Sequence, residues 1–220
     1  MSIRKWLFYK AYSRFIPNYY FLLRRETKNC RTVIDLGCGN TSPGKYVKSK
    51  NHYWVGVDRF EPYLTQSSYH KIHDKYIKSD ILKLKMPAKS FECAMALDVI
   101  EHLEKKDGSK LINIMEALAS KKIIIFTPNG FLPQKIKNGN IFQEHKSGYS
   151  CEEMKKMGFN VYGVNGYKGL RKEEAGFKYS PRWIWFFISE LTQFLAYFFP
   201  KKAYQIFCVK SIEGKRLHRV

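Results

Sequence analysis

Seven short apolar runs, four of which end in acidic residues or glycines, most strongly limit what this chain can fold into. The runs are 32–36, 53–57, 75–78, 92–97, 122–127, 159–164 and 203–209. Several are almost continuously apolar, which is typical of strands covered on both faces. Helical patterns lie between them, including 103–119 and 151–157. This alternation predicts an α/β protein with a doubly wound, largely parallel sheet.

The polar ends of four consecutive strands are expected to meet at one edge of this sheet. In doubly wound sheets, ligands bind beyond the carboxyl ends of the strands, at the point where the strand order reverses. The groups that these four strands deliver there are Asp35 with Gly37 and Gly39, then Asp58, Asp80 and Asp98. The sequence therefore predicts a ligand site at this edge.

The ligand is constrained by the turn after the first strand, D-L-G-C-G at 35–39. A nicotinamide dinucleotide would suit the position of Asp58, but its G-x-G-x-x-G fingerprint lacks the third glycine, because Ser42 stands there. A pyrophosphate also disfavours a carboxylate such as Asp35 beside it. An acid at this turn suits a ligand with an ammonium or sulfonium charge at one end and a ribose at the other.

Five motifs between residues 30 and 165 resemble those of class I S-adenosylmethionine-dependent methyltransferases of the small-molecule branch. They are V-I-D-L-G-C-G-N, V-G-V-D, K-S-D-I, A-L-D-V-I-E-H-L and, at 126–130, F-T-P-N-G. The resemblance implies a Rossmann-like sheet of seven strands, mostly parallel with the last strand antiparallel. It also implies S-adenosylmethionine as the cofactor and methyl transfer as the reaction.

The resemblance assigns each motif a part of the cofactor. Asp58 would hold both ribose hydroxyls, while Asp80 would accept from the adenine amino group and Ile81 would pack on the ring. The other cofactor contacts that the resemblance implies are Asp35, Gly37, Cys38 and Gly39 near the methionyl end, Arg59 after the ribose acid, and Leu97 and Asp98 beside the sulfonium.

Two histidines are candidates for a base that takes the proton of the acceptor. His145 lies in the loop Q-E-H-K-S-G-Y-S, and His102 follows Glu101 at the end of the fourth strand. The segment D-V-I-E-H also resembles one that holds magnesium in some O-methyltransferases, so a divalent metal at Asp98, Glu101 and His102, with His145 as a further ligand, is a second hypothesis. D-V-x-E-H also occurs in relatives without a metal, and we favour a site with none.

The formal charge of +20 predicts an anionic partner or a solubilising surface. Residues 1–31 carry eight Lys/Arg against one acid, and residues 167–220 carry eleven against four. Both segments are rich in aromatic residues, a combination that suits an anionic membrane surface. Nucleic acid is disfavoured because neither a known RNA-binding module nor the N-P-P-aromatic motif of base methylation occurs. The expected acceptor is small or lipid-like, with methylation at oxygen.

The chain is expected to divide into a basic, aromatic helical segment at 1–30, which forms a lid or contacts a membrane, and a methyltransferase domain at 31–220. Residues 167–202 form a helical insert between the last two strands. Within it, the amphipathic stretch 183–199 is expected to pack onto the sheet, because it is shorter than the ~20 residues that span a bilayer. Five cysteines without a C-x-x-C predict a reduced, cytoplasmic protein, peripheral at the inner membrane surface if the basic flanks bind lipid.

Two other functions stay open at this point. The basic flanks would let the chain methylate RNA instead of a small molecule. A non-catalytic relative that binds the cofactor, or serves as an interaction module, would keep the same turns.

Overall fold

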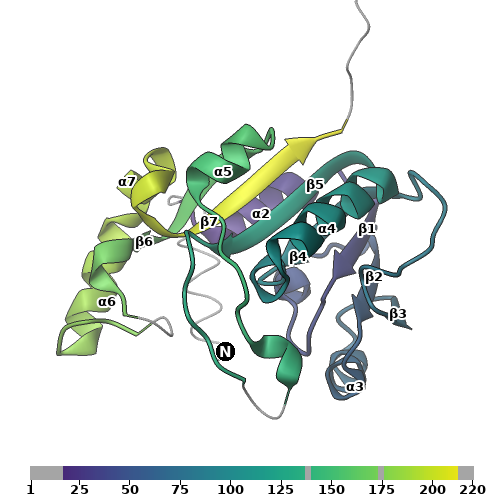
Figure 1. Cartoon of the computed structure of the whole chain (residues 1–220), viewed down its shortest axis with the longest axis horizontal. Coiled ribbons are helices and arrows are strands. Elements are labelled where there is room, and N and C mark those ends of the chain that lie inside the picture. Colours follow the sequence, from purple (N-terminus) through teal and green to yellow (C-terminus); the bar gives the residue numbers. More distant parts are fainter. Residues whose placement is uncertain (1–16, 137–139, 173–175, 213–220) are drawn as a thin grey trace, which may run out of the picture.

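The computed structural model describes residues 17–136, 140–172 and 176–212. Its centre is a seven-stranded sheet in the order β3-β2-β1-β4-β5-β7-β6 (Figure 1). Strands β1 to β5 pair in parallel, whereas β7 runs antiparallel to both β5 and β6. The predicted fold class is therefore confirmed, including the antiparallel last strand.

The elements alternate along the chain much as the apolar runs predict. The strands are β1 (Thr32–Leu36), β2 (Tyr53–Asp58), β3 (Lys75–Lys78), β4 (Phe91–Leu97), β5 (Ala119–Pro128), β6 (Asn160–Tyr167) and β7 (Ala203–Ser211). The helices are α2 (Tyr19–Thr27), α3 (Glu61–Tyr69), α4 (Lys105–Leu118), α5 (Cys151–Lys156), α6 (Arg182–Leu191) and α7 (Gln193–Phe198), with short 3-10 turns between. The predicted strands all occur, with bounds shifted by at most a few residues.

Both faces of the sheet are covered, which explains why its strands are apolar throughout. One core forms where Leu111 and Met115 of α4 and Met154 of α5 pack on the sheet. The other forms where Leu22 and Leu23 of α2 pack on the opposite face. Figure 1 shows α4 and α5 in front of the sheet and α2 behind it.

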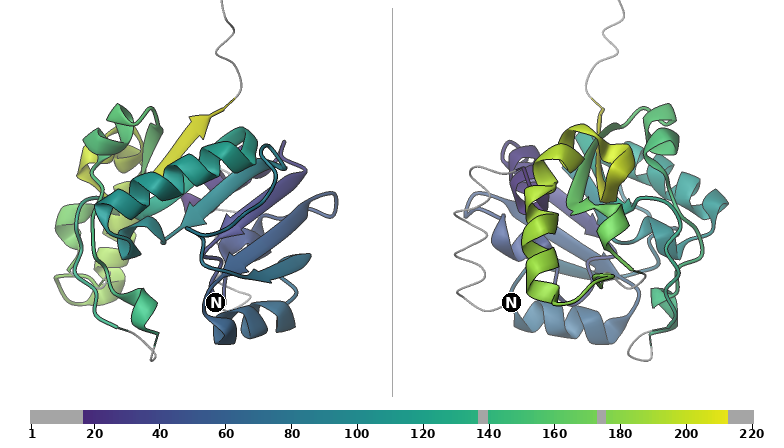
Figure 2. Two further views of the ribbon diagram at one scale, coloured as in Figure 1. Left: turned by 45° about the vertical axis from the view of Figure 1, so that its right-hand side comes forward. Right: turned by 90° about the vertical axis from the view of Figure 1, so that its left-hand side faces the viewer.

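The helices between β6 and β7 differ from the expectation that their apolar side packs inward. Helix α7 contacts β6, but the buried residues of the pair are the small or polar Ser189, Gln193 and Ala196. Most of the large apolar side chains face outward, whereas Tyr197 stacks on Tyr162 of β6. The exposed residues are Trp183, Ile184, Phe187, Leu191, Phe194, Leu195, Phe198 and Phe199. Close packing against β6 explains the inversion, because a Cβ at Gly163 of β6 would lie 2.0 Å from the carbonyl oxygen of Ala196. Figure 2 shows both helices at the outer side of the sheet.

No helix among the residues that the structure describes has the length and apolar character needed to cross a membrane.

Candidate functional site

A cavity of about 290 Å³ opens at the carboxyl ends of β1, β2 and β4. Seven of the residues predicted to bind the cofactor line it: Gly37, Gly39, Asp58, Arg59, Asp80, Ile81 and Asp98. A cavity therefore lies at the edge of the sheet where the polar strand ends predicted a ligand site.

The two glycines of the first motif serve different purposes. Gly37 adopts a φ of +73°, and a Cβ there would lie 2.6 Å from Cγ2 of Val99, so the packing of the loop after β4 requires glycine. Gly39 adopts a φ of +58°, and a Cβ there would meet no atom within 4 Å. Its bare backbone faces open space, where a ligand has room to approach.

Asp58 ends β2 with its carboxylate held by backbone amides. The Gly39 N–H donates to Oδ2 at 2.9 Å, and the Phe60 N–H donates to Oδ1 at 2.8 Å. Burial raises the pKa of this carboxyl, and the amide hydrogen bonds oppose that effect. The first and second motifs are thus joined by one side chain, fixed where it can accept hydrogen bonds from a ligand.

A loop after β5 completes the cavity and was not predicted to do so. Phe142 lies 3.7 Å from the guanidinium of Arg59 in a cation–π contact, and Arg59 also lies 3.9 Å from Asp80. Asn140, Gln143 and Lys146 line the cavity as well. No local motif marks these loop residues, because their position depends on how the loop folds back over the sheet.

Asp35, Cys38 and Leu97 are not among the residues that line this cavity. Asp35 is 1% exposed, and its Oδ2 accepts from Ser42 Oγ at 2.6 Å and lies 3.0 Å from His73 Nε2. Through these contacts the buried Asp35 carboxylate holds the turn after β1 in position. Cys38 and Leu97 are buried, and burial raises the pKa of the Cys38 thiol.

Asp98 adopts a φ of +54° directly after β4, which turns its side chain into the cavity. Gln205 of β7 donates to its Oδ1 at 3.2 Å. Although the side chain is exposed to the cavity, the surrounding protein desolvates the carboxyl and raises its pKa to about 7. Tyr19 of helix α2 is close enough to Asp98 to interact with its charge. Burial, and then the charge of Asp98, raise the pKa of the Tyr19 hydroxyl.

Glu101 is buried and faces the same region from the turn after β4. Thr127 Oγ1 donates to its Oε2 at 3.0 Å. Burial, and then the charge of Asp98, raise the pKa of the Glu101 carboxyl well above its usual value. Its backbone oxygen accepts from the amides of Lys146 and Ser147, which attaches the loop after β5 to the end of β4.

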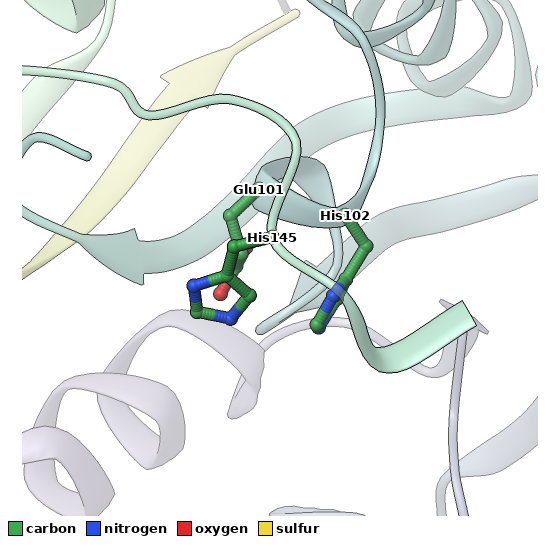
Figure 3. Close-up of side chains that lie close together, drawn as sticks. All are labelled: Glu101, His102 and His145. Carbon is green, nitrogen blue, oxygen red and sulfur yellow. The ribbon is translucent and has the colours of Figure 1, made fainter. Parts of the chain in front are cut away.

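The two candidate base residues lie side by side, with ring centres 4.7 Å apart (Figure 3). His102 Nδ1 lies 3.0 Å from the carbonyl oxygen of Glu144, and His145 Nδ1 lies 2.6 Å from that of Leu132. A carbonyl oxygen can only accept, so each Nδ1 carries a proton and the basic lone pair of each ring is on Nε2.

Glu101, His102 and His145 also form the group that fits a divalent metal. One ligand atom from each lies within 4.8 Å of the other two. Two imidazoles and a carboxylate are a suitable mixed set for a divalent ion. Asp98, which the metal hypothesis included, is not a member of this group. Figure 3 shows His145 arriving from the loop after β5, opposite the turn that carries the other two.

A second cavity of about 270 Å³ contains this cluster and adjoins the first. Asp98, His102 and Gln143 line both cavities. The second is also lined by Glu101, Pro128, Leu132, Gln134, His145, Tyr204 and Gln205. The arrangement provides one space for a nucleoside and an adjoining one, with basic groups, for a second reactant.

Comparisons with known proteins agree with this geometry. Residues 34–126 match the family model described as a methyltransferase domain. Over 108 residues the chain is 23% identical to the sterol 24-C-methyltransferase erg-4 of Neurospora crassa, a match that covers 46% of this chain and 28% of that enzyme. The matched segment thus spans less than a third of the relative.

Solved structures share the fold at low identity. An S-adenosylmethionine-dependent methyltransferase from Archaeoglobus fulgidus is 18% identical, with coverage of 92% of this chain and 99% of that one and a TM-score of 0.55. The methyltransferase domain of bacterial CtHen1 is 16% identical, with coverage of 87% and 96% and a TM-score of 0.54. Residues 34–126 are therefore similar to the methyltransferase domain family, and the chain carries the fold seen in class I S-adenosylmethionine-dependent methyltransferases, as its motifs indicated.

Proposed function

We propose that this chain transfers the methyl group of S-adenosylmethionine to an oxygen of a small or lipid-like acceptor. The observation that supports this most directly is the pair of adjoining cavities. One presents Asp58 and the Gly39 backbone, and the other presents two imidazoles, with Asp98 and His102 at their boundary.

The donor, when bound, supplies an electrophilic methyl carbon on a good leaving group, so the protein mainly aligns the acceptor. On this proposal His145 Nε2 takes the proton of the acceptor hydroxyl as the oxygen attacks, with His102 beside it to orient the acceptor. The carbonyl oxygen of Leu132 fixes the tautomer that this role requires. If a divalent ion binds at Glu101, His102 and His145 instead, the same imidazoles ligate it and the ion lowers the pKa of the acceptor hydroxyl.

The donor site is tested by calorimetry with S-adenosylmethionine. We expect Asp58→Ala to weaken binding about 100-fold, because hydrogen bonds to a carboxylate contribute about 1.5–3 kcal/mol each. Glu61→Ala is the matched control, since Glu61 is an exposed acid whose one ion pair in the described part of the chain is with Lys78. Equal affinity of Asp58→Ala and the wild type would contradict the site, and no binding by the wild type would favour a non-catalytic interaction protein.

The acceptor class is tested with a cell extract and methyl-labelled donor. We expect label in small-molecule or lipid products, identified by mass spectrometry. The alternative, RNA methylation using the basic flanks, predicts label in RNA and RNA binding that weakens steeply with salt.

We further propose that the outward side of α6 and α7 contacts an anionic membrane surface, which would place the protein on the cytoplasmic face of the membrane. Leu191 is 76% exposed and Trp183 65% exposed. Exposed Arg182, Lys201 and Lys202 flank these apolar side chains. Aromatic and aliphatic residues bordered by cations are typical of helices that lie in an anionic lipid interface.

Vesicle sedimentation tests this contact, with phosphatidylglycerol and phosphatidylcholine vesicles compared. We expect binding to phosphatidylglycerol vesicles, and about a tenfold loss in Trp183→Ser/Leu191→Ser, because each apolar side chain gains free energy on leaving water. Tyr69→Ser is the control, since Tyr69 on α3 is 84% exposed but distant from α6 in sequence and sheet order. Equal sedimentation of the wild type and both variants would refute the proposal.

A further inference from the structure

A third cavity, of about 830 Å³, lies beyond the cavity that holds the two histidines. Five basic residues line it: Lys135, Lys168, Arg171, Lys172 and Lys178. The remaining lining residues are Pro128, Asn129, Phe131, Leu132, Pro133 and Tyr204, and none of the lining residues is acidic. Five cations without a carboxylate among the described lining residues give the cavity a strongly positive potential.

Four of the five basic side chains come from residues 168–172 and 176–178, which follow β6, and Lys135 comes from the segment after β5. The Lys178 N–H donates to the Leu170 carbonyl at 3.0 Å, and the Lys172 N–H donates to the Gly176 carbonyl at 2.7 Å. Arg171 and Phe177 form a β-bridge between the two arms. The backbone therefore sets the position of these cations.

Arg171 is fixed more firmly than the lysines. Its guanidinium lies 4.4 Å from the ring of Phe177 and 5.3 Å from that of Tyr204, and its Nη2 donates to Ser189 Oγ at 3.2 Å. These contacts with two aromatic rings and a hydroxyl hold the guanidinium in a fixed position at the cavity wall. In contrast, Lys135, Lys168, Lys172 and Lys178 form no ion pair within residues 17–136, 140–172 and 176–212.

The third cavity, called the cationic cavity from here on, adjoins the proposed reaction centre. Pro128, Leu132 and Tyr204 line both this cavity and the one that contains His102 and His145. The three cavities thus follow one another from Asp58 past the histidines to Arg171.

We propose that the cationic cavity binds a phosphate or diphosphate group of the acceptor, while the hydroxyl to be methylated lies near His145. This inference rests on the proposed methyl transfer and narrows its acceptor to a phosphorylated molecule. Several lysines around one arginine suit a polyanion better than a single carboxylate. The apolar rim at Phe131, Leu132 and Tyr204 accommodates the part of the acceptor between its two polar ends.

Calorimetry of the full chain with inorganic pyrophosphate tests the cavity directly. We expect Lys168→Gln/Lys178→Gln to weaken pyrophosphate binding about tenfold, since each removes a cation from the cavity. The matched control is Lys106→Gln/Lys110→Gln, which removes the same charge from exposed positions on α4 that line none of the three cavities. The control is expected to bind like the wild type, and all three proteins are expected to bind S-adenosylmethionine equally.

Two results would overturn the proposal: no pyrophosphate binding by the wild type, or equal weakening in the double variant and in its control. Failure of the proposed methyl transfer would give a different result. The protein would then not bind S-adenosylmethionine, whereas it would still bind pyrophosphate.

The source of the phosphate is distinguished by competition. Vesicles of phosphatidic acid that displace pyrophosphate would assign the cavity to a lipid headgroup. Displacement by soluble sugar phosphates, but not by the vesicles, would assign it to a soluble phosphate ester. Failure of both classes to displace pyrophosphate would overturn the assignment of the cavity to the acceptor.

Discussion

Asp98 combines an unusual backbone conformation with an unusual ionisation state. Its positive φ turns the chain after β4 so that the carboxyl enters the cavity, and desolvation raises its pKa to about 7. Gln205 contacts it from the far end of the chain. A residue recognised from a local motif thus acquires its raised pKa from burial in the folded chain, which no local motif shows.

The raised pKa of Asp98 predicts a pH-dependent effect of Asp98→Asn. The unfolded carboxyl ionises near its usual value of 3.8, whereas the folded one ionises near 7. Between these values the folded state binds more protons, so stability falls as pH rises from about 4 to about 7. We expect Asp98→Asn to melt at a higher temperature than the wild type at pH 8 and at the same temperature near pH 4. An equal difference at both values would contradict the raised pKa.

His145 is predicted to be needed for turnover and not for donor binding. We expect His145→Ala to lower kcat about 100-fold, the usual contribution of a general base, with the affinity for S-adenosylmethionine unchanged. The rates are compared in the presence of a chelator. Loss of wild-type activity with the chelator, and recovery with added Mn²⁺, would replace the base with a metal held by Glu101, His102 and His145.

At the scale of elements, Gly108 shows how one helix is fitted to its surroundings. It lies inside α4, where glycine lowers helix stability. A Cβ at this position would lie 1.9 Å from the hydroxyl oxygen of Tyr149, whose ring also contacts the ammonium of Lys105 at 3.9 Å. The glycine therefore lets the segment before α5 pack closely against α4.

Gly108→Ala is predicted to destabilise the protein despite its higher helix propensity. The overpacking against Tyr149 is expected to lower the free energy of unfolding by about 1–3 kcal/mol. Ser109→Ala, at the next and exposed position of α4, is expected to stay within about 0.5 kcal/mol of the wild type. Urea unfolding of both variants measures the difference, and a more stable Gly108→Ala would show that the contact relaxes freely.

The apolar periodicity of the sequence predicts which face is buried for some elements and not for others. The strands and α4 follow from apolar runs and stripes, because their apolar side chains point into the core. The stretch 183–199 has an equally clear amphipathic pattern, but its polar side packs on β6 and its apolar side faces outward. A pattern shows that a helix has two faces, and only the tertiary contacts decide which one is buried.

At the scale of the whole molecule, the charge of +20 is large for 220 residues. The ten acid–base pairs among the described residues do not lower this net charge, because each joins a group of either sign, and the described residues that line the cationic cavity include five cations and no acid. Such an excess lowers the stability of a compact chain through self-repulsion, and salt screens it.

The melting temperature is therefore predicted to rise with ionic strength. Between about 20 mM and about 300 mM sodium chloride we expect an increase of about 3 °C, which corresponds to about 1 kcal/mol for a chain of this size. The same scan in an equal osmolality of sucrose controls for effects unrelated to charge. A melting temperature independent of salt would mean that the excess charge is too dispersed to repel.

The sequence by itself determined the sheet, the edge at which ligands can bind, and the motif residues that line the cavity at the carboxyl ends of β1, β2 and β4. Strand burial and the residues at strand ends are local properties of the sequence. It could not indicate that the Asp35 carboxylate contacts His73 or that Phe142 covers Arg59. Those contacts join residues 38 and 83 positions apart. Long-range packing decided them, since neighbours in the folded chain are chosen by the geometry of the sheet and the loop that returns over it.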